Sequence, residues 1–184
     1  MDGGQEKRRQ NDDATNTSPV ARTHPRKGTP HTVETRELKL SKRRLIVEVA
    51  VPGRITNLEV FLSEFAREHS GPERVSDLLN GELDFLPGIG ADEKVFLLGL
   101  DSILWVRVEG APHEDDEAGP PTEVDATLRF DDGSELKSTA RYRPAPGYGR
   151  LLDFLNTGAR FIELLSADGV VYVNRRRISL VSVE

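Results

Sequence analysis

The chain has 184 residues, of which 36% are hydrophobic, 30% are charged and none is cysteine, and its formal net charge at pH 7 is −6. The absence of cysteine excludes disulfides, Cys-ligated metal sites and thiol catalysis. No apolar run approaches the ~18 residues of a transmembrane helix, and the start lacks the apolar stretch of a secretory signal. We therefore expect a cytoplasmic protein with no membrane contact.

Residues 1–36 form a polar segment rich in Asn, Asp, Thr, Pro, Arg and Lys. Such a composition does not offset the entropy cost of ordering the chain, so we expect a disordered tail. Residues 1–44 hold 11 Lys and Arg against 6 Asp and Glu, and this basic stretch precedes an acidic body. Two interpretations are open: the tail is simply solvated, or it touches nucleic acid or an acidic partner.

Residues 37–109 are expected to form a first β-rich unit. Alternating apolar residues predict a strand over 44–51, ended by a Pro-Gly turn. The pattern of 55–68 fits both a helix and a strand, and the second half of the chain favours the strand. One or two helical turns follow at 74–80. Then come a short strand at 83–90 that ends at Pro87-Gly88, a buried strand at 94–100, and a return at 103–109 that we interpret as a β-hairpin.

Residues 110–122 contain acidic residues and three prolines but no large apolar residue, and this composition predicts a linker. Residues 123–184 then repeat the plan as a second β-rich unit. Alternating strands are expected at 123–130 and 135–144, a helical turn at 150–156, a strand at 159–165, and a second hairpin at 169–184.

The two units share a sequence motif. Residues 74–86 and 150–162 are identical at 5 of 13 positions without a gap, and one gap aligns the rest to the end. Agreement in order, spacing and identity favours an internal duplication over chance. The repeated motif contains Arg74, Asp77, Asn80 and Phe85 in the first copy, and Arg150, Asp153, Asn156 and Phe161 in the second.

The fold class expected from these patterns is mainly β, or α+β. We predict two tandem small units, each a β-roll of the SH3-like or Sm-like kind with about five strands and one short helix. About 62 residues bury little surface alone. We therefore expect the units to pair about a pseudo-twofold axis.

The motif of Arg74, Asp77 and Asn80, with the later Phe85, resembles an uncharacterised bacterial small β-domain family, a domain of unknown function. The second copy is more similar to the family's turn, with Asn174, Arg175 and Ile178, whereas the first has Gly99 and Leu100 in place of Asn and Arg. The resemblance implies a bacterial protein with two tandem copies of this domain. It implies no activity.

No chemical site is predicted: no catalytic residue, no cofactor and no metal. The four histidines fall in the tail, a loop and the linker, without convergent partners. Asp77 and Asp153 are equivalent carboxylates, but each lies in the first turn of a short helix, where it would cap backbone N–H groups. We interpret them as structural residues, not as an acid/base pair.

Arg175, Arg176 and Arg177 are expected at the tip of the second hairpin, where three cations would contact an acidic partner or phosphate; the alternative is a solvated turn protected against edge pairing. Trp105 belongs either to the core or to a partner surface. The favoured function is a non-enzymatic protein–protein interaction or assembly module, with a protein partner or self-association. The alternative is a nucleic-acid-binding regulator that uses the basic tail and the three arginines.

Overall fold

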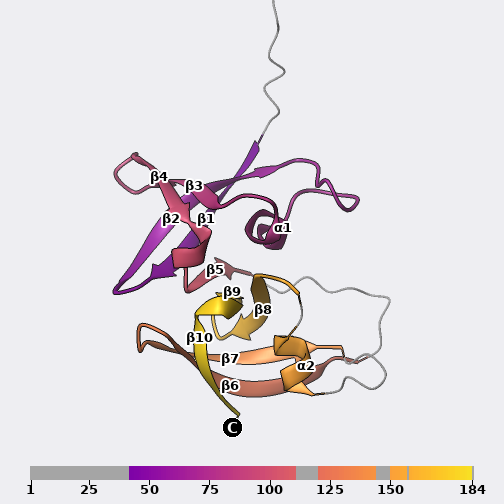
Figure 1. Ribbon diagram of the computed structural model, residues 1–184. Helices are drawn as coiled ribbons and strands as arrows, with labels where there is room; N and C mark the ends of the chain where they lie inside the picture. The colour runs from indigo at the N-terminus through magenta and orange to yellow at the C-terminus, as the bar shows by residue number, and fades with distance from the viewer. Residues whose placement is uncertain (1–41, 111–119, 144–149, 157, 184) are drawn as a thin grey trace, which may run out of the picture. The chain divides into compact units, whose positions relative to one another are not determined.

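The computed structural model describes residues 42–110, 120–143, 150–156 and 158–183 (Figure 1). Contacts divide the chain into Met1–Glu37 and Leu38–Glu184, and every described residue belongs to the second of these units. The expected disordered tail (1–36) and most of the expected acidic linker (110–122) lie outside the described residues. Below, the first half means residues 42–110 and the second half means residues 120–183.

The described part of the chain is mainly β, as predicted. It contains ten strands, two short α-helices and two single-turn 3₁₀ helices, η1 and η2. The first half runs β1 (Lys42–Val51), β2 (Arg54–Ser63), α1 (Val75–Asn80), β3 (Phe85–Gly90), β4 (Val95–Gly99), η1 (Leu100–Ser102) and β5 (Trp105–Glu109). The second half runs β6 (Thr122–Phe130), β7 (Glu135–Tyr142), α2 (Leu151–Leu155), β8 (Phe161–Ser166), β9 (Gly169–Asn174), η2 (Arg175–Arg177) and β10 (Ile178–Val183).

Along the chain, the same order of elements therefore occurs twice. The ambiguous segment that begins at residue 55 is a strand as far as Ser63, as the second half suggested. None of the described helices has the length and apolar character needed to span a membrane.

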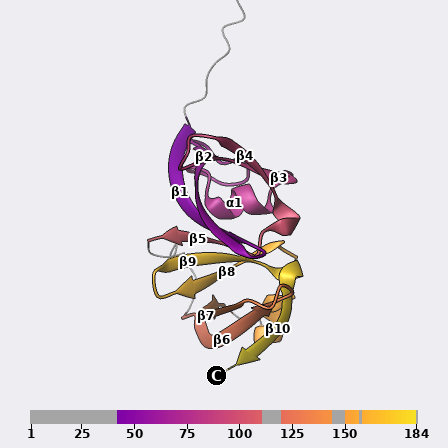
Figure 2. The same ribbon diagram turned by 90° about the vertical axis from the view of Figure 1, so that its left-hand side faces the viewer.

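All ten strands belong to one sheet in the order β10-β6-β7-β8-β9-β5-β1-β2-β3-β4, and each neighbouring pair is antiparallel. The halves meet where β5 pairs with β9, two strands that lie side by side in Figure 2. A pseudo-twofold pair would join equivalent strands, but β5 is the fifth strand of its half and β9 the fourth. The predicted pseudo-twofold pairing is therefore wrong.

The predicted hairpins are also wrong. β4 pairs with β3, whereas β5 pairs with β1 and β9. The reason is the η1 turn between them. The Leu100 N–H donates to the carbonyl oxygen of Asp84, and the Leu104 N–H donates to that of Ala50. These bonds hold one end of the turn at Asp84, the residue before β3, and the other at Ala50 in β1. The chain therefore crosses from β4 to the other side of β1 instead of reversing.

Two further details of the first half differ from expectation. β3 continues through Pro87 to Gly90, and its register with β2 covers only Ile89 and Gly90. A proline earlier in the strand is tolerated because that side of the strand is not hydrogen-bonded there. β4, predicted to be buried, is the terminal strand of the sheet, and Val95 and Leu97 are exposed on it.

Two hydrophobic cores cover opposite faces of the β5–β9 pair. In β9, Val170 and Tyr172 belong to the first core, whereas the alternate residues Val171 and Val173 belong to the second. Each core draws residues from both halves. The first core contains Phe161, Val170 and Tyr172 from the second half, and the second core contains Ala50, Leu104 and Trp105 from the first half.

The close approach of β5 and β9 requires a glycine at position 169. Gly169 has φ of +144°, and a Cβ there would overlap the carbonyl oxygen of Val108. Gly133 also has a positive φ, +86°, but a Cβ there would meet no atom within 4 Å.

We predict that Gly169→Ala lowers the free energy of unfolding by about 2–3 kcal/mol, because it adds a backbone clash to the strain of a positive φ. The matched variant Gly133→Ala carries the strain alone and should cost about 1 kcal/mol. Urea unfolding followed by circular dichroism measures both. Equal losses would show that the strands do not approach as closely as described.

Candidate interaction site

The repeated motif begins with a carboxylate at the start of each helix. Asp77 Oδ2 accepts a hydrogen bond from the Arg74 N–H at 2.8 Å, and Asp153 Oδ2 accepts one from the Arg150 N–H at 3.2 Å. Asp77 also contacts His69 Nε2 at 2.8 Å, and this hydrogen bond raises the pKa of His69 above its usual value. Both carboxylates thus hold the first turn of a short helix, in the structural role that the sequence favoured.

The motif asparagines bond differently. Asn80 Nδ2 donates to the Phe161 carbonyl oxygen at 3.0 Å, and the Phe161 N–H donates to Asn80 Oδ1 at 2.8 Å. This side chain therefore joins helix α1 of the first half to strand β8 of the second. Its counterpart Asn156 donates to the Leu152 carbonyl oxygen within its own helix.

A second, buried asparagine at the end of β9 also bonds across the junction, which here means the contact of the two halves along β5 and β9. Asn174 is fully buried, and its Nδ2 donates to the carbonyl oxygens of Leu100 at 3.1 Å and Ile103 at 3.0 Å. Its Oδ1 accepts the Arg176 N–H at 3.1 Å. An amide with these partners is satisfied inside the protein, and it holds the η1 turn of the first half against the η2 turn of the second.

Trp105 lies in the second core and is nearly fully buried, opposite Val173 in the β5–β9 register. The guanidinium of Arg107 lies 4.7 Å from the centre of its ring and pairs with Glu48 at 2.7 Å. Of the two sequence interpretations, the structure therefore places Trp105 in the core. Its ring is covered on one side by a cation that is itself paired.

Residues 175–177 form η2, which does not tip a hairpin. Arg177 Nη2 lies 2.9 Å from Asp131 Oδ1, and Arg176 Nη1 lies 3.6 Å from Asp101 Oδ1. The Arg175 N–H donates to the Arg160 carbonyl oxygen at 3.0 Å. Arg176 and Arg177 therefore contact acidic residues of this chain, and the exposed pair of Arg176 with Asp101 links the second half to the first.

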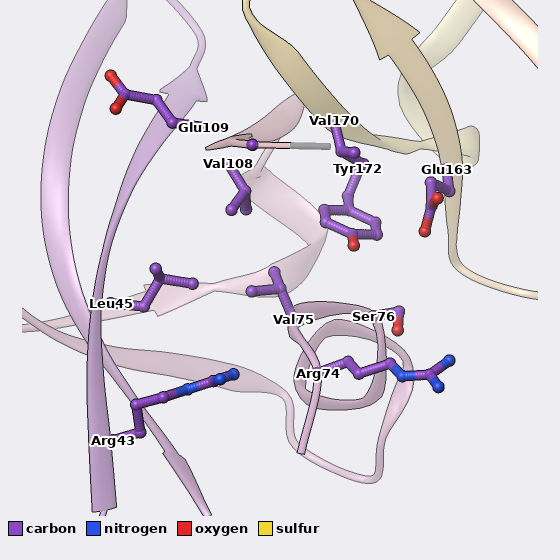
Figure 3. Close-up of a pocket in the computed structure, with 11 residues that line it drawn as sticks. Arg43, Leu45, Arg74, Val75, Ser76, Val108, Glu109, Glu163, Val170 and Tyr172 are labelled. Atoms are coloured by element: carbon purple, nitrogen blue, oxygen red, sulfur yellow. The ribbon is translucent and has the colours of Figure 1, made fainter. Parts of the chain in front are cut away.

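A small pocket lies beside the junction (Figure 3). Its volume is about 190 Å³, and Arg74, Ser76, Glu163 and Tyr172 are among the residues that line it. Burial, followed by the nearby Glu163 carboxylate, raises the pKa of the Tyr172 hydroxyl well above its usual value, so that hydroxyl stays protonated. Ligand pockets measure roughly 300–1,000 Å³, and this one is smaller. We interpret it as a surface gap where residues of the two halves meet.

Among the described residues, no group of three or more His, Cys, Asp or Glu side chains is placed to hold a metal ion. The polar side chains that line the pocket can donate and accept hydrogen bonds.

The end strands β4 and β10 each have one neighbour among the described strands. Apolar side chains are exposed along them: Phe85 on β3 beside β4, Val95 and Leu97 on β4, and Leu180 and Val183 on β10. Of these five residues, only Phe85 was expected to matter, as a motif residue, and the exposure of the other four was not predicted. For β4 no local signal of exposure was present, because the uncharged run between Lys94 and Asp101 has the composition of a central strand.

The matched asparagines give a direct test of the junction. Asn80→Ala should lower the free energy of unfolding by about 2 kcal/mol, because it leaves the N–H and carbonyl of Phe161 without partners in a partly buried place. Asn156→Ala removes one exposed bond within a helix and should cost about 0.5–1 kcal/mol. Chemical denaturation measures both; a larger loss for Asn156→Ala would contradict the described role of Asn80.

Comparison with known proteins gives no relative from which a role can be carried over. No protein-family model matches the chain, and no curated protein or solved structure is significantly similar to it. The function proposed below therefore rests on the chain's own residues and geometry.

Proposed function

We propose that this chain is a non-enzymatic interaction or assembly module, built from two tandem copies of one small β unit of the SH3-like or Sm-like kind. Three features support the duplication. The element order occurs twice, the sheet repeats the strand order β5-β1-β2-β3-β4 as β10-β6-β7-β8-β9, and each helix begins with the same aspartate bond to an arginine N–H. The resemblance to a bacterial domain of unknown function is consistent with this proposal and adds no activity to it.

The observation that carries the proposed function is the exposed apolar edge formed by Phe85, Val95 and Leu97. Proteins usually protect a terminal strand with charges, prolines or bulges, since its free N–H and carbonyl groups can pair with another chain. Here Lys94 precedes the apolar residues, and its ammonium pairs with Asp92 at 2.8 Å. An apolar terminal strand of this kind is suited to binding an added strand.

The nucleic-acid alternative receives no comparable support. Arg176 and Arg177 both contact acidic side chains of their own chain, so phosphate would have to compete with these pairs. The basic tail, the other part of that hypothesis, lies outside the described residues. We therefore keep the interaction module as the proposed function.

A capture experiment tests the module. The full chain, cross-linked in cell extract and analysed by mass spectrometry, should retain a set of protein partners, which includes any second copy of itself. The double variant Val95→Lys/Leu97→Lys should lose that set. Binding would bury these two side chains, and burial of two unpaired cations is costly. The control Ile55→Lys changes an exposed apolar residue of β2, away from the terminal strand, and should behave as the original chain.

Circular dichroism of each variant checks that the fold is retained. Partners captured equally by the original chain and by Val95→Lys/Leu97→Lys would contradict the role of the edge. Capture that disappears after nuclease treatment would instead support the nucleic-acid alternative and overturn the proposed function.

A further inference from the structure

At three pairs of aligned positions, the side chain is buried in the second copy and exposed in the first. Phe161, Val170 and Tyr172 in the second copy have exposed fractions of 2%, 5% and 9%. Their counterparts Phe85, Val95 and Leu97 in the first copy have exposed fractions of 58%, 71% and 68%. The first set is buried because it lies in the first core, most of whose residues come from the first half. The second set has no described neighbour in that position.

The first half covers its set with two elements. Helix α1 supplies Asn80, which bonds both backbone groups of Phe161, and β5 supplies Val106 and Val108, which lie opposite Tyr172 and Val170 in the register. Together these form a receiving surface for the fourth strand of another unit.

The second half carries the same receiving elements without an occupant among the described residues. The counterpart of β5 is β10, where Val181 and Val183 occupy the positions of Val106 and Val108. Val183 is exposed on the terminal strand. The counterpart of α1 is α2, which has no fully buried residue, whereas α1 buries three, namely Val75, Leu78 and Leu79. Asn156 stands where Asn80 stands, with its amide turned to its own helix.

From this correspondence we infer that the occupant is a second copy of this chain, whose β4 pairs antiparallel with β10 as β9 pairs with β5 inside one chain. The internal register places Val95 of one copy opposite Val183 of the next, and Leu97 opposite Val181. Phe85 then lies beneath α2, within reach of Asn156. This inference rests on the proposed function and names the partner of the same edge.

The contact between chains differs from the internal junction in ways that set its strength. Gly99 occupies the position of Asn174, so the buried amide and its three hydrogen bonds are missing. Leu180 replaces Trp105 and Ser182 replaces Arg107, so less side chain is buried. The contact between chains is therefore weaker than the internal one, and the assembly should depend on protein concentration.

The contact is also not self-complementary, because a β4 edge meets a β10 edge. Every chain carries one edge of each kind, and each added copy leaves one of each open. Such head-to-tail contacts continue until they close into a ring or extend as a filament.

Two variants that each block one edge test this arrangement. Val95→Lys/Leu97→Lys blocks β4, and Val183→Lys blocks β10. Sedimentation velocity should show multiples of the 20.4 kDa chain mass for the original protein and for the Ile55→Lys control. Each blocked variant alone should fall to the mass of one chain. An equimolar mixture of the two should form a complex of two chains and nothing larger, because one intact β4 and one intact β10 remain.

Other outcomes overturn the inference in distinguishable ways. A β4-blocked variant that still dimerises would show a symmetric contact through β10. A mixture that stays at the mass of one chain would show that β4 and β10 do not meet. An original chain that remains single at all concentrations would refute self-assembly, while edge-dependent capture of a different protein would leave the proposed function standing.

Discussion

The antiparallel pairing of β5 with β9 is the interaction on which the rest of this structure depends. Side chains alternate along both strands between two cores, so one ladder of backbone hydrogen bonds supports both. A unit of about 62 residues buries a small fraction of its surface alone. Loss of the pair would remove three apolar side chains from each core. Full burial of such a side chain contributes roughly 1.5–3 kcal/mol, a large share of the stability of a domain.

Polar groups make this pairing specific. The amides of Asn80 and Asn174 bond the backbone of the opposite half, and displaced strands would leave those amides or their partners unsatisfied at a cost of about 1–3 kcal/mol each. These hydrogen bonds determine which strand of the second half pairs with β5. At the corresponding positions, the Asn156 amide bonds to Leu152 of its own half, and Gly99 has no side chain. The internal contact of β5 with β9 is thus held by side-chain hydrogen bonds. The equivalent strands at the ends of the sheet, β10 and β4, expose apolar side chains instead, and this difference motivates the proposed assembly.

Local patterns predicted the strands well, because alternation in segments such as residues 45–51 and 136–142 reflects one buried face. They failed where the outcome depends on remote residues. A short turn such as 100–102 has the same local sequence whether the chain reverses or crosses the sheet. The hydrogen bonds from Leu100 to Asp84 and from Leu104 to Ala50 decide the outcome. The uncharged run at 95–100 has the composition of a central strand, although it begins with the terminal strand β4. The acidic partners of Arg176 and Arg177 are distant in sequence, so their pairing left no local signal.

The most direct test of the account is whether β4 and β10 of separate chains meet in the internal register. The chain contains no cysteine, so introduced thiols report only the contact between them. A mixture of Val95→Cys and Val183→Cys chains, oxidised mildly, should form a mixed disulfide dimer. Val95→Cys mixed with Leu180→Cys, which alters a position out of register, should not. A bond in the second mixture, or no bond in the first, would contradict the head-to-tail arrangement.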